Sequence, residues 1–90
     1  MILEFDKSFL KSLDNIRDSK TLLRLEKNIT DLENAESMHE ISNLRKLSGF
    51  KNYYRIRIGD YRLGFELINS NIIRLIVIAH RKDIYKIFPS

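Results

Sequence analysis

The stretch YRIRIGDYRLGFEL, from Tyr54 to Leu67, decides the fold that we expect for this chain. On each side of its Gly-Asp pair, apolar residues alternate with polar ones, which is the period of a β-strand with one buried face. Glycine at the first central position suits a two-residue hairpin turn. Counting back from that turn, the register pairs Ile58 with Tyr61, Arg57 with Arg62, Ile56 with Leu63, and Arg55 with Gly64. The stretch is therefore predicted to be a β-hairpin with one apolar face and one arginine face.

Two amphipathic helices are predicted before the hairpin. Asp6 is a suitable N-cap for a helix over residues 7–16, and a second helix is expected over residues 19–34. The apolar stripe of the first helix comprises Phe9, Leu10, Leu13 and Ile16. That of the second, with 3,4,3 spacing, comprises Leu22, Leu25, Ile29 and Leu32. Each helix is expected to bury this stripe.

The remaining elements complete an α+β fold. Strands are expected at residues 1–5 and 72–79, with a possible short strand at 44–47 and a last helical turn at 85–88. The nearly continuous apolar run at 72–79 indicates a central strand that is covered on both faces. We predict one domain over residues 1–90, with two N-terminal helices packed on one face of a mostly antiparallel four-stranded sheet, in the order β-α-α-β-β-β. The helices should cover the hairpin's apolar face and leave its arginine face open.

Composition excludes several classes of protein. The 90 residues contain no cysteine, so no disulfide framework, thiolate metal site or cysteine nucleophile is expected, and a cytoplasmic location fits. The N-terminal segment is amphipathic and carries acids, so we do not interpret it as a signal peptide. No run of 18 apolar residues exists, hence no membrane partner is expected. Neither a metal-ligand spacing nor a Gly-rich phosphate loop is present, so no metal or cofactor is predicted.

Charge is divided unevenly along the chain. Residues 1–44 hold six Lys/Arg and nine Asp/Glu, a net charge of −3, whereas residues 45–90 hold ten and three, a net charge of +7. This asymmetry favours a surface for a polyanion such as nucleic acid, built by the second half. A solvated basic face without a partner is the alternative.

Arginine on the hairpin is the most specific local signal. Arg57 opposite Arg62 is an unfavourable like-charge pair, and Arg55 lies on the same face. Arginine suits bidentate contacts with phosphate, so we interpret these residues as an anion site. Additional basic residues that could join it are Lys46, Arg81 and Lys82. The alternative is that these groups are solvated or paired with Glu66 and Asp83.

Three other side chains are candidates for a role in such a site. Tyr85, four residues after Arg81, and Tyr53, on the arginine face, could stack on unpaired bases, or could instead pack against the core. His80 would be a natural general acid or base near neutral pH. However, neighbouring residues of a strand point to opposite faces, so His80 and Arg81 would share a site only if the strand had ended.

The segments FDKSFLKSL (5–13), KLSGFKNYYRIRIGDYRLGFEL (46–67) and IAHRKDIYK (78–86) resemble the RelE/ParE family of bacterial type II toxins. The resemblance extends over essentially the whole chain. It implies the same fold and a toxin that enters the ribosomal A site and cuts mRNA. The ribose 2′-OH would attack the adjacent phosphate, leaving a 2′,3′-cyclic phosphate and a 5′-OH.

The resemblance also implies roles for individual residues. Arg55 and Arg57 match two basic residues of the family's active strand, and Arg62 matches the arginine that steadies the transition-state phosphate. Arg81 matches an arginine that assists the leaving oxygen, and Tyr85 matches the tyrosine that stacks on a codon base. RelE-like enzymes commonly carry lysines where this chain has Arg55 and Arg57. Arginine stays protonated, so the general base is open, with Lys46 and His80 as candidates.

The family implies partners and alternatives as well. A small cognate antitoxin should silence the toxin as a helix or added strand lying across it, and operator DNA would be bound only through that antitoxin. ParE-like members share the fold but inhibit DNA gyrase without cutting RNA, which is the main alternative function. A purely regulatory member whose basic face only holds its antitoxin is the third possibility.

Overall fold

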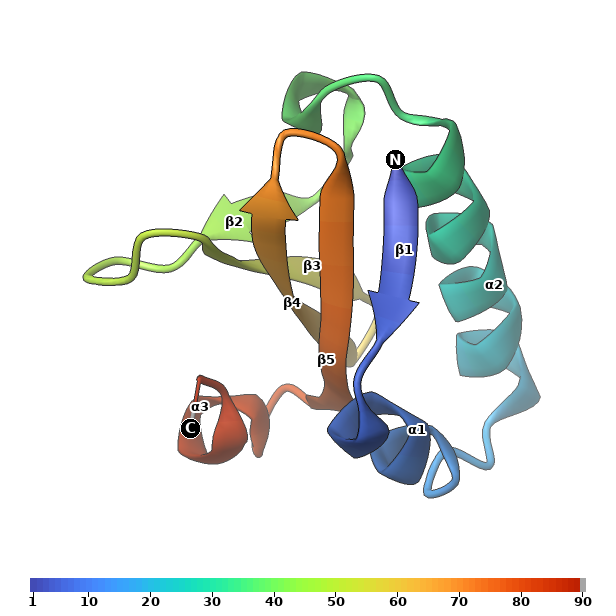
Figure 1. Ribbon diagram of the computed structural model, residues 1–90. Coiled ribbons are helices and arrows are strands. Elements are labelled where there is room, and N and C mark those ends of the chain that lie inside the picture. The colour runs from blue at the N-terminus through green and yellow to red at the C-terminus, as the bar shows by residue number, and fades with distance from the viewer. Residues whose placement is uncertain (90) are drawn as a thin grey trace.

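The predicted hairpin is the centre of the structure, a computed structural model that describes residues 1–89 (Figure 1). Strands β3 (Tyr53–Ile58) and β4 (Tyr61–Asn69) pair antiparallel around the Gly59-Asp60 turn. All four predicted cross-strand pairs are present, from Ile58 opposite Tyr61 to Arg55 opposite Gly64. Gly59 has a φ of 59°, the left-handed conformation that its place in the turn requires.

The sheet has five strands in the order β1-β5-β4-β3-β2, so the prediction of four strands was wrong. Besides the two hairpin strands, the sheet contains β1 (Ile2–Phe5), β2 (Leu44–Lys46) and β5 (Ile72–His80). The four-stranded pattern omitted β2, whose three residues form an edge strand paired with β3. The sheet is also mixed, because β1 runs parallel to β5. Tight turns impose antiparallel pairing on β3, β4 and β5, whereas no turn joins β1 to β5 and fixes its direction.

Both predicted helices are present, as α1 (Lys7–Leu13) and α2 (Ser19–Asn34). The side chains of Asp6 and Asp18 accept the N-cap hydrogen bonds. Helix α1 ends three residues earlier than predicted, because the chain tightens into bonds from Asn15 and Ile16 to the carbonyls of Ser12 and Leu13. Ile16 is buried from that turn instead of from a helix.

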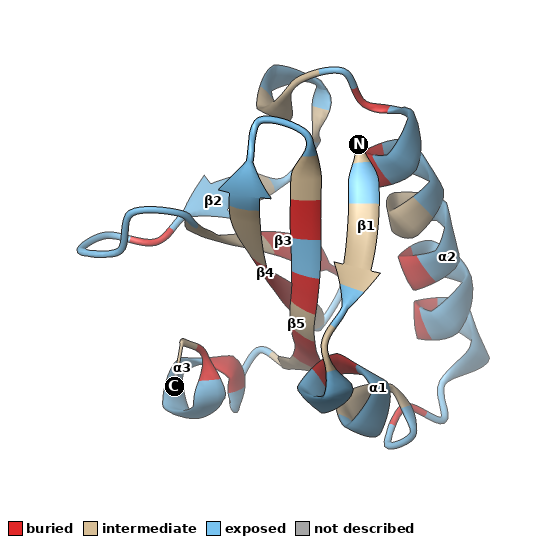
Figure 2. Ribbon diagram, in the orientation of Figure 1, coloured by how far each residue is buried: buried red, intermediate tan, exposed pale blue. Residues whose placement is uncertain are grey.

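The main core lies between these helices and the predicted apolar face of the hairpin, which confirms that expectation. Phe9, Leu25 and Leu32 of the helices pack with Ile56 and other buried residues of the sheet. Figure 2 shows buried residues on the sheet-facing side of α2 and along β5. Leu10 is half exposed and Leu22 is also exposed, so the buried stripes are narrower than predicted.

A second, smaller core covers part of the opposite face, where an open surface was expected. Helix α3 (Ile84–Ile87) lies there, and Ile84 and Phe88 pack with Leu47 and Val77 (Figure 1). A Cβ placed on Gly64 would lie 2.7 Å from the Phe88 ring, so the glycine makes room for this packing. The arginine face is therefore bounded by α3, which confines it to a cleft. A 3₁₀ turn, Met38–Glu40, links α2 to the sheet.

Strand β5 is buried on both faces, as its apolar sequence predicted. Leu75 and Ile78 face the main core and Val77 faces the smaller one, because a bulge at Ile76 breaks the simple alternation. None of the helices in the described part of the chain is long and apolar enough to cross a membrane.

Candidate active site

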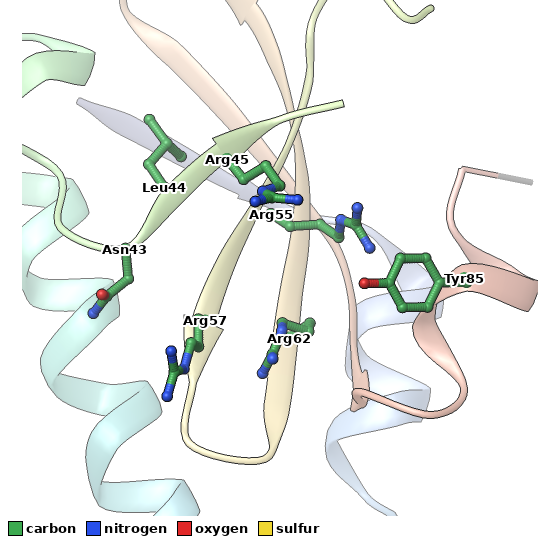
Figure 3. Close-up of a pocket in the computed structure, with 7 residues that line it drawn as sticks. All are labelled: Asn43, Leu44, Arg45, Arg55, Arg57, Arg62 and Tyr85. Atoms are coloured by element: carbon green, nitrogen blue, oxygen red, sulfur yellow. The ribbon is translucent and has the colours of Figure 1, made fainter. Parts of the chain in front are cut away.

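Four arginines and one tyrosine line a cleft of about 390 Å³ on the arginine face (Figure 3). We call this the arginine cleft; its lining is Asn43, Leu44, Arg45, Arg55, Arg57, Arg62 and Tyr85. Strands β2, β3 and β4 contribute the arginines, and α3 contributes the tyrosine from the opposite side. Three of the predicted arginines and Tyr85 are thus brought together in one place.

Strand pairing puts like charges directly opposite one another in this cleft. Arg45 lies opposite Arg55 across β2 and β3, and Arg57 lies opposite Arg62 across β3 and β4. Such pairs destabilise a sheet. Among the residues that the structure describes, the one ion pair joins Arg74 to Glu4, so neither Glu66 nor Asp83 neutralises the cleft. This arrangement suits a site whose anion comes from outside the chain.

Arg55 and Tyr85 form a stacked unit at the end of the cleft next to α3. The guanidinium carbon of Arg55 lies 4.5 Å from the centroid of the Tyr85 ring, within range of a cation–π contact. The Nε atom of Arg55 is buried and has no hydrogen-bond acceptor among residues 1–89. In Figure 3 the Tyr85 hydroxyl points into the cleft. Since Tyr85 is 72% exposed, the ring face away from Arg55 is open for another planar group.

Arg62 is held by the hairpin turn itself. Its Nη1 donates to the main-chain oxygens of Gly59 and Tyr61, each at 2.9 Å. Both bonds use one nitrogen, so the Nε and Nη2 donors remain to bind an anion in the cleft. A guanidinium that is already oriented loses less entropy on binding than a free one.

Several predicted site residues lie elsewhere. Lys46 is opposite Tyr54, on the face covered by α1 and α2. Arg81 and Lys82 are exposed in the turn after β5, and neither lines the cleft; the Arg81 amide donates to the Asp60 carbonyl at 2.8 Å. Tyr53 is on the arginine side but packs in an aromatic cluster, 5.5 Å from the Phe88 ring.

His80 points away from the arginine cleft. It pairs with Tyr61, whose side chain packs against the main core, and the two rings meet edge to face at 5.6 Å. Its Nδ1 accepts the Lys82 amide at 3.2 Å. With Lys46 and His80 both outside, the ionisable side chains that line the cleft are arginines and one tyrosine. The lining of the cleft therefore contains no lysine, histidine or carboxylate that could serve as a general base.

Sequence reasoning missed Arg45 and Asn43. The signal for Arg45 was present, because a strand over residues 44–47 turns Arg45 and Lys46 to opposite faces. Which of the two joins the arginines depends on the β2–β3 register, and the sequence alone did not supply it. Asn43 precedes β2 in a polar connector, where its sequence context carries no distinctive signal.

Comparison with known proteins gives consistent matches. The family model "ParE toxin of type II toxin-antitoxin system, parDE" matches residues 3–85. Toxin RelE3 of Methanocaldococcus jannaschii is 36% identical over 86 residues, which cover 94% of this chain and 96% of that protein. The solved RelB-RelE antitoxin-toxin complex from Methanococcus jannaschii contains a chain with a TM-score of 0.80 and 35% identity, covering 96% of this chain and 99% of that one. The intact E. coli RelBE complex matches with a TM-score of 0.68 at 22% identity, over 88% and 94% of the two chains, which supports the fold alone.

Proposed function

We propose that this chain, which belongs to the RelE/ParE family of toxins of type II toxin-antitoxin systems, is an endoribonuclease that cleaves mRNA in its arginine cleft. The observation that carries the proposal is the convergence of four arginines and an exposed tyrosine ring in one cleft. Guanidinium groups recognise phosphate, and an aromatic ring stacks on an unpaired base. A single-stranded RNA offers both groups.

In the proposed reaction, the ribose 2′-oxygen attacks the adjacent phosphorus. A bond forms between the 2′-oxygen and phosphorus, and the bond from phosphorus to the 5′-oxygen breaks, giving a 2′,3′-cyclic phosphate and a 5′-OH end. Negative charge grows on the non-bridging oxygens as the phosphorane forms. Arg62, Arg57 and Arg55 stabilise that charge, which is the principal catalytic effect that such a cleft can supply. Arg45 adds a fourth cation that was not anticipated.

The proton steps use solvent in this account. Arginine does not release its proton, and neither Lys46 nor His80 lines the cleft. Hydroxide or water takes the 2′-proton and water gives a proton to the leaving 5′-oxygen, while the clustered cations lower the cost of forming the 2′-oxyanion. Arg81, in the exposed turn beside Asp60, would have to swing its side chain inward to assist the leaving 5′-oxygen.

The ribosome and an antitoxin complete the proposed function. A cleft without a side-chain base gains most from a partner that holds the RNA in line for attack, which favours mRNA presented in the ribosomal A site. The M. jannaschii relative was solved with a RelB antitoxin. By analogy, a small antitoxin would occupy the basic face of this chain, and operator DNA would be bound through the antitoxin.

Inhibition of DNA gyrase is the second candidate, since the matching family model is that of ParE toxins. That activity requires no phosphate cleft and no stacking ring. The convergence of Arg55, Arg62 and Tyr85 therefore favours the nuclease.

Expression in a bacterium without an antitoxin separates the two functions. Incorporation of labelled amino acids and of labelled thymidine is followed after induction. The nuclease predicts that protein synthesis stops first and DNA synthesis continues at the early time points. If thymidine incorporation fails first while translation continues, the chain is a gyrase inhibitor and the proposal is wrong.

A further inference from the structure

A second basic cavity, of about 260 Å³, adjoins the arginine cleft on the side of α2. Its lining is Arg24, Lys27, Asn28, Asn43, Arg57, Ile58 and Gly59. Two of these residues, Asn43 and Arg57, also line the arginine cleft, so the cavities are contiguous. Figure 3 shows both side chains on the side of the cleft that is nearer to α2 and away from Tyr85. We call this cavity the α2 subsite.

The α2 subsite is built by close contact between helix α2 and the hairpin turn. Arg24 and Lys27 are three residues apart on the helix and so project from the same side. The Arg24 Nη1 lies 2.7 Å from the position that a Cβ would take on Gly59. A larger residue at 59 would displace the guanidinium, so glycine there serves both the turn and the position of Arg24.

Asn43 occupies the boundary between the two cavities in a costly conformation. Its φ of 61° is the only positive value at a non-glycine residue in the described part of the chain. Its carbonyl accepts the Arg57 amide at 3.2 Å. Asparagine tolerates the left-handed region better than other non-glycine residues, and such strain concentrates at functional sites. The strained residue thus stands where one cavity passes into the other, and it helps to position the arginine they share.

The charge of the α2 subsite is not neutralised by the residues that the structure describes. None of its lining residues is acidic, and the ion pair formed within residues 1–89 joins the distant Arg74 and Glu4. Two additional cations, both on exposed residues, therefore stand next to the arginine cleft. A continuous track with cations at one end and the Tyr85 ring at the other matches a single strand that carries a phosphate at every nucleotide.

We propose that Arg24 and Lys27 bind the phosphate that neighbours the scissile phosphate in the same RNA strand, with Arg57 lying between the two phosphates. This inference rests on the proposed function and extends it to a second position of the substrate. Arg24 and Lys27 are thus binding residues that hold the strand in register, while the arginine cleft performs the chemistry.

The test measures binding of short RNA oligonucleotides that are 2′-O-methylated and so cannot be cleaved. The variant Arg24→Gln/Lys27→Gln is compared with Lys11→Gln/Arg17→Gln, which removes one lysine and one arginine that line neither cavity. Each lost contact to single-stranded RNA should reduce the slope of log K against log salt by about 0.7. Because Arg24 and Lys27 bind one phosphate, losing it should narrow the affinity difference between the variant and wild type about 2.6-fold between 50 and 200 mM salt. The control should keep the wild-type slope, and thermal melts should show that both variants fold.

A second experiment identifies the phosphate that Arg24 and Lys27 bind. Each phosphate of the oligonucleotide is replaced in turn by a neutral methylphosphonate. At one position the replacement should weaken binding to wild type and to the control, yet leave binding to Arg24→Gln/Lys27→Gln unchanged. Equal slopes for the two variants, or a methylphosphonate effect that persists in Arg24→Gln/Lys27→Gln, would overturn the inference.

Three further outcomes are distinguishable. If Arg24→Gln/Lys27→Gln binds ribosomes less tightly without coupling to any oligonucleotide phosphate, the cations contact ribosomal RNA and the inference is wrong. If wild type cleaves mRNA on ribosomes but no methylphosphonate effect depends on Arg24 and Lys27, the inference fails and the proposed function stands. Absence of both binding and cleavage by wild type would overturn both.

Discussion

At the scale of the residue, the choice of arginine over lysine determines the chemistry open to the cleft. A lysine in a crowded basic site can lose its proton and act as a base, whereas the guanidinium of Arg55 or Arg57 stays charged. The two candidates for a general base, Lys46 and His80, lie on the face covered by α1 and α2. Catalysis therefore depends on fixed positive charge.

The pH dependence of cleavage follows from this composition. We expect the single-turnover rate of mRNA cleavage on ribosomes to rise with hydroxide from pH 6 to 9, without a plateau near the ordinary histidine pKa of about 6.5. His80→Gln and Lys46→Ala should each cleave within a few-fold of wild type. A profile that is flat above neutrality, together with a loss of about 10²-fold in His80→Gln, would identify a histidine-dependent nuclease and contradict this account.

Tyr85 should act through its ring and not through its hydroxyl. One ring face contacts Arg55 and the other is open, so Tyr85→Phe should retain near-wild-type RNA binding. Tyr85→Ala should weaken binding by about 1–3 kcal/mol, the typical contribution of one base stacked on an aromatic ring. Lys86→Ala, at the next exposed position of α3, is the control for both binding and stability. An equal loss of RNA affinity in Tyr85→Phe and Tyr85→Ala would show that the hydroxyl, and not ring stacking, contributes to binding.

Strand alternation made part of this site predictable from the sequence. Arg55, Arg57 and Arg62 could be assigned to one face because the Gly59-Asp60 turn fixes the register of β3 and β4. No tight turn joins β2 to β3. The sequence therefore did not determine which of Arg45 and Lys46 lies on the arginine face. The aromatic packing of Tyr53 depends on where Phe88 folds back, which local pattern does not encode.

At the scale of the element, helix α3 turns an open sheet face into a cleft. Helix α3 is a single turn of four residues, and its position depends on the packing of Phe88 over Gly64 of β4. The sequence predicted a helical turn here but not its packing, because four residues carry too weak an apolar period to define a buried side. Tyr85 reaches Arg55 because this small core holds the helix in place.

Substitution of Gly64 by alanine tests that coupling. The added Cβ would lie 2.7–2.9 Å from three atoms of the buried Phe88 ring, so the ring and α3 must move. We expect a loss of about 1–3 kcal/mol in the free energy of unfolding by urea, faster exchange of the Phe88 amide, which donates to the Ile84 carbonyl, and slower cleavage. Adding Phe88→Leu should recover part of the stability. Wild-type stability and exchange in Gly64→Ala would contradict the contact between Phe88 and Gly64.

The N-caps of α1 and α2 give the fold a dependence on acid pH. Hydrogen bonds from the Ser8 hydroxyl and amide lower the pKa of Asp6 below its ordinary value of 3.8. Bonds from the Thr21 hydroxyl and the Lys20 amide lower the pKa of Asp18 likewise. Because both pKa values are lowered in the folded state, the stabilisation is complete above the unfolded value and is lost as pH falls through the folded one.

The melting temperature should therefore decline below about pH 3.8. Asp6→Asn/Asp18→Asn should melt close to wild type at neutral pH, since asparagine is also a good N-cap, but should lose less stability on acidification. Asp31→Asn, on the exposed part of α2, is the control and should follow wild type. An identical acid decline in the cap variant would show that these carboxylates do not contribute.

At the scale of the whole molecule, the two faces of the sheet have different roles. One face binds α1 and α2 and forms the main core, while the other presents the cations of the second half of the chain in the cleft bounded by α3. The charge division of the sequence predicted the second face, and the apolar periods predicted the first. The parallel pairing of β1 with β5 could not be predicted, because it joins segments about 70 residues apart with no local signal of direction.

Single-turnover cleavage of mRNA on purified ribosomes shows whether the arginine cleft cleaves RNA. Wild type, Arg62→Ala and the control Arg17→Ala are compared, and the ends of the products are identified. We expect 2′,3′-cyclic phosphate and 5′-OH ends with wild type and Arg17→Ala, and a loss of at least about 10²-fold in rate with Arg62→Ala, the cost typical of removing one preorganised donor. Circular dichroism should show that Arg62→Ala stays folded. Undiminished cleavage by folded Arg62→Ala, or no cleavage by wild type, would contradict the account.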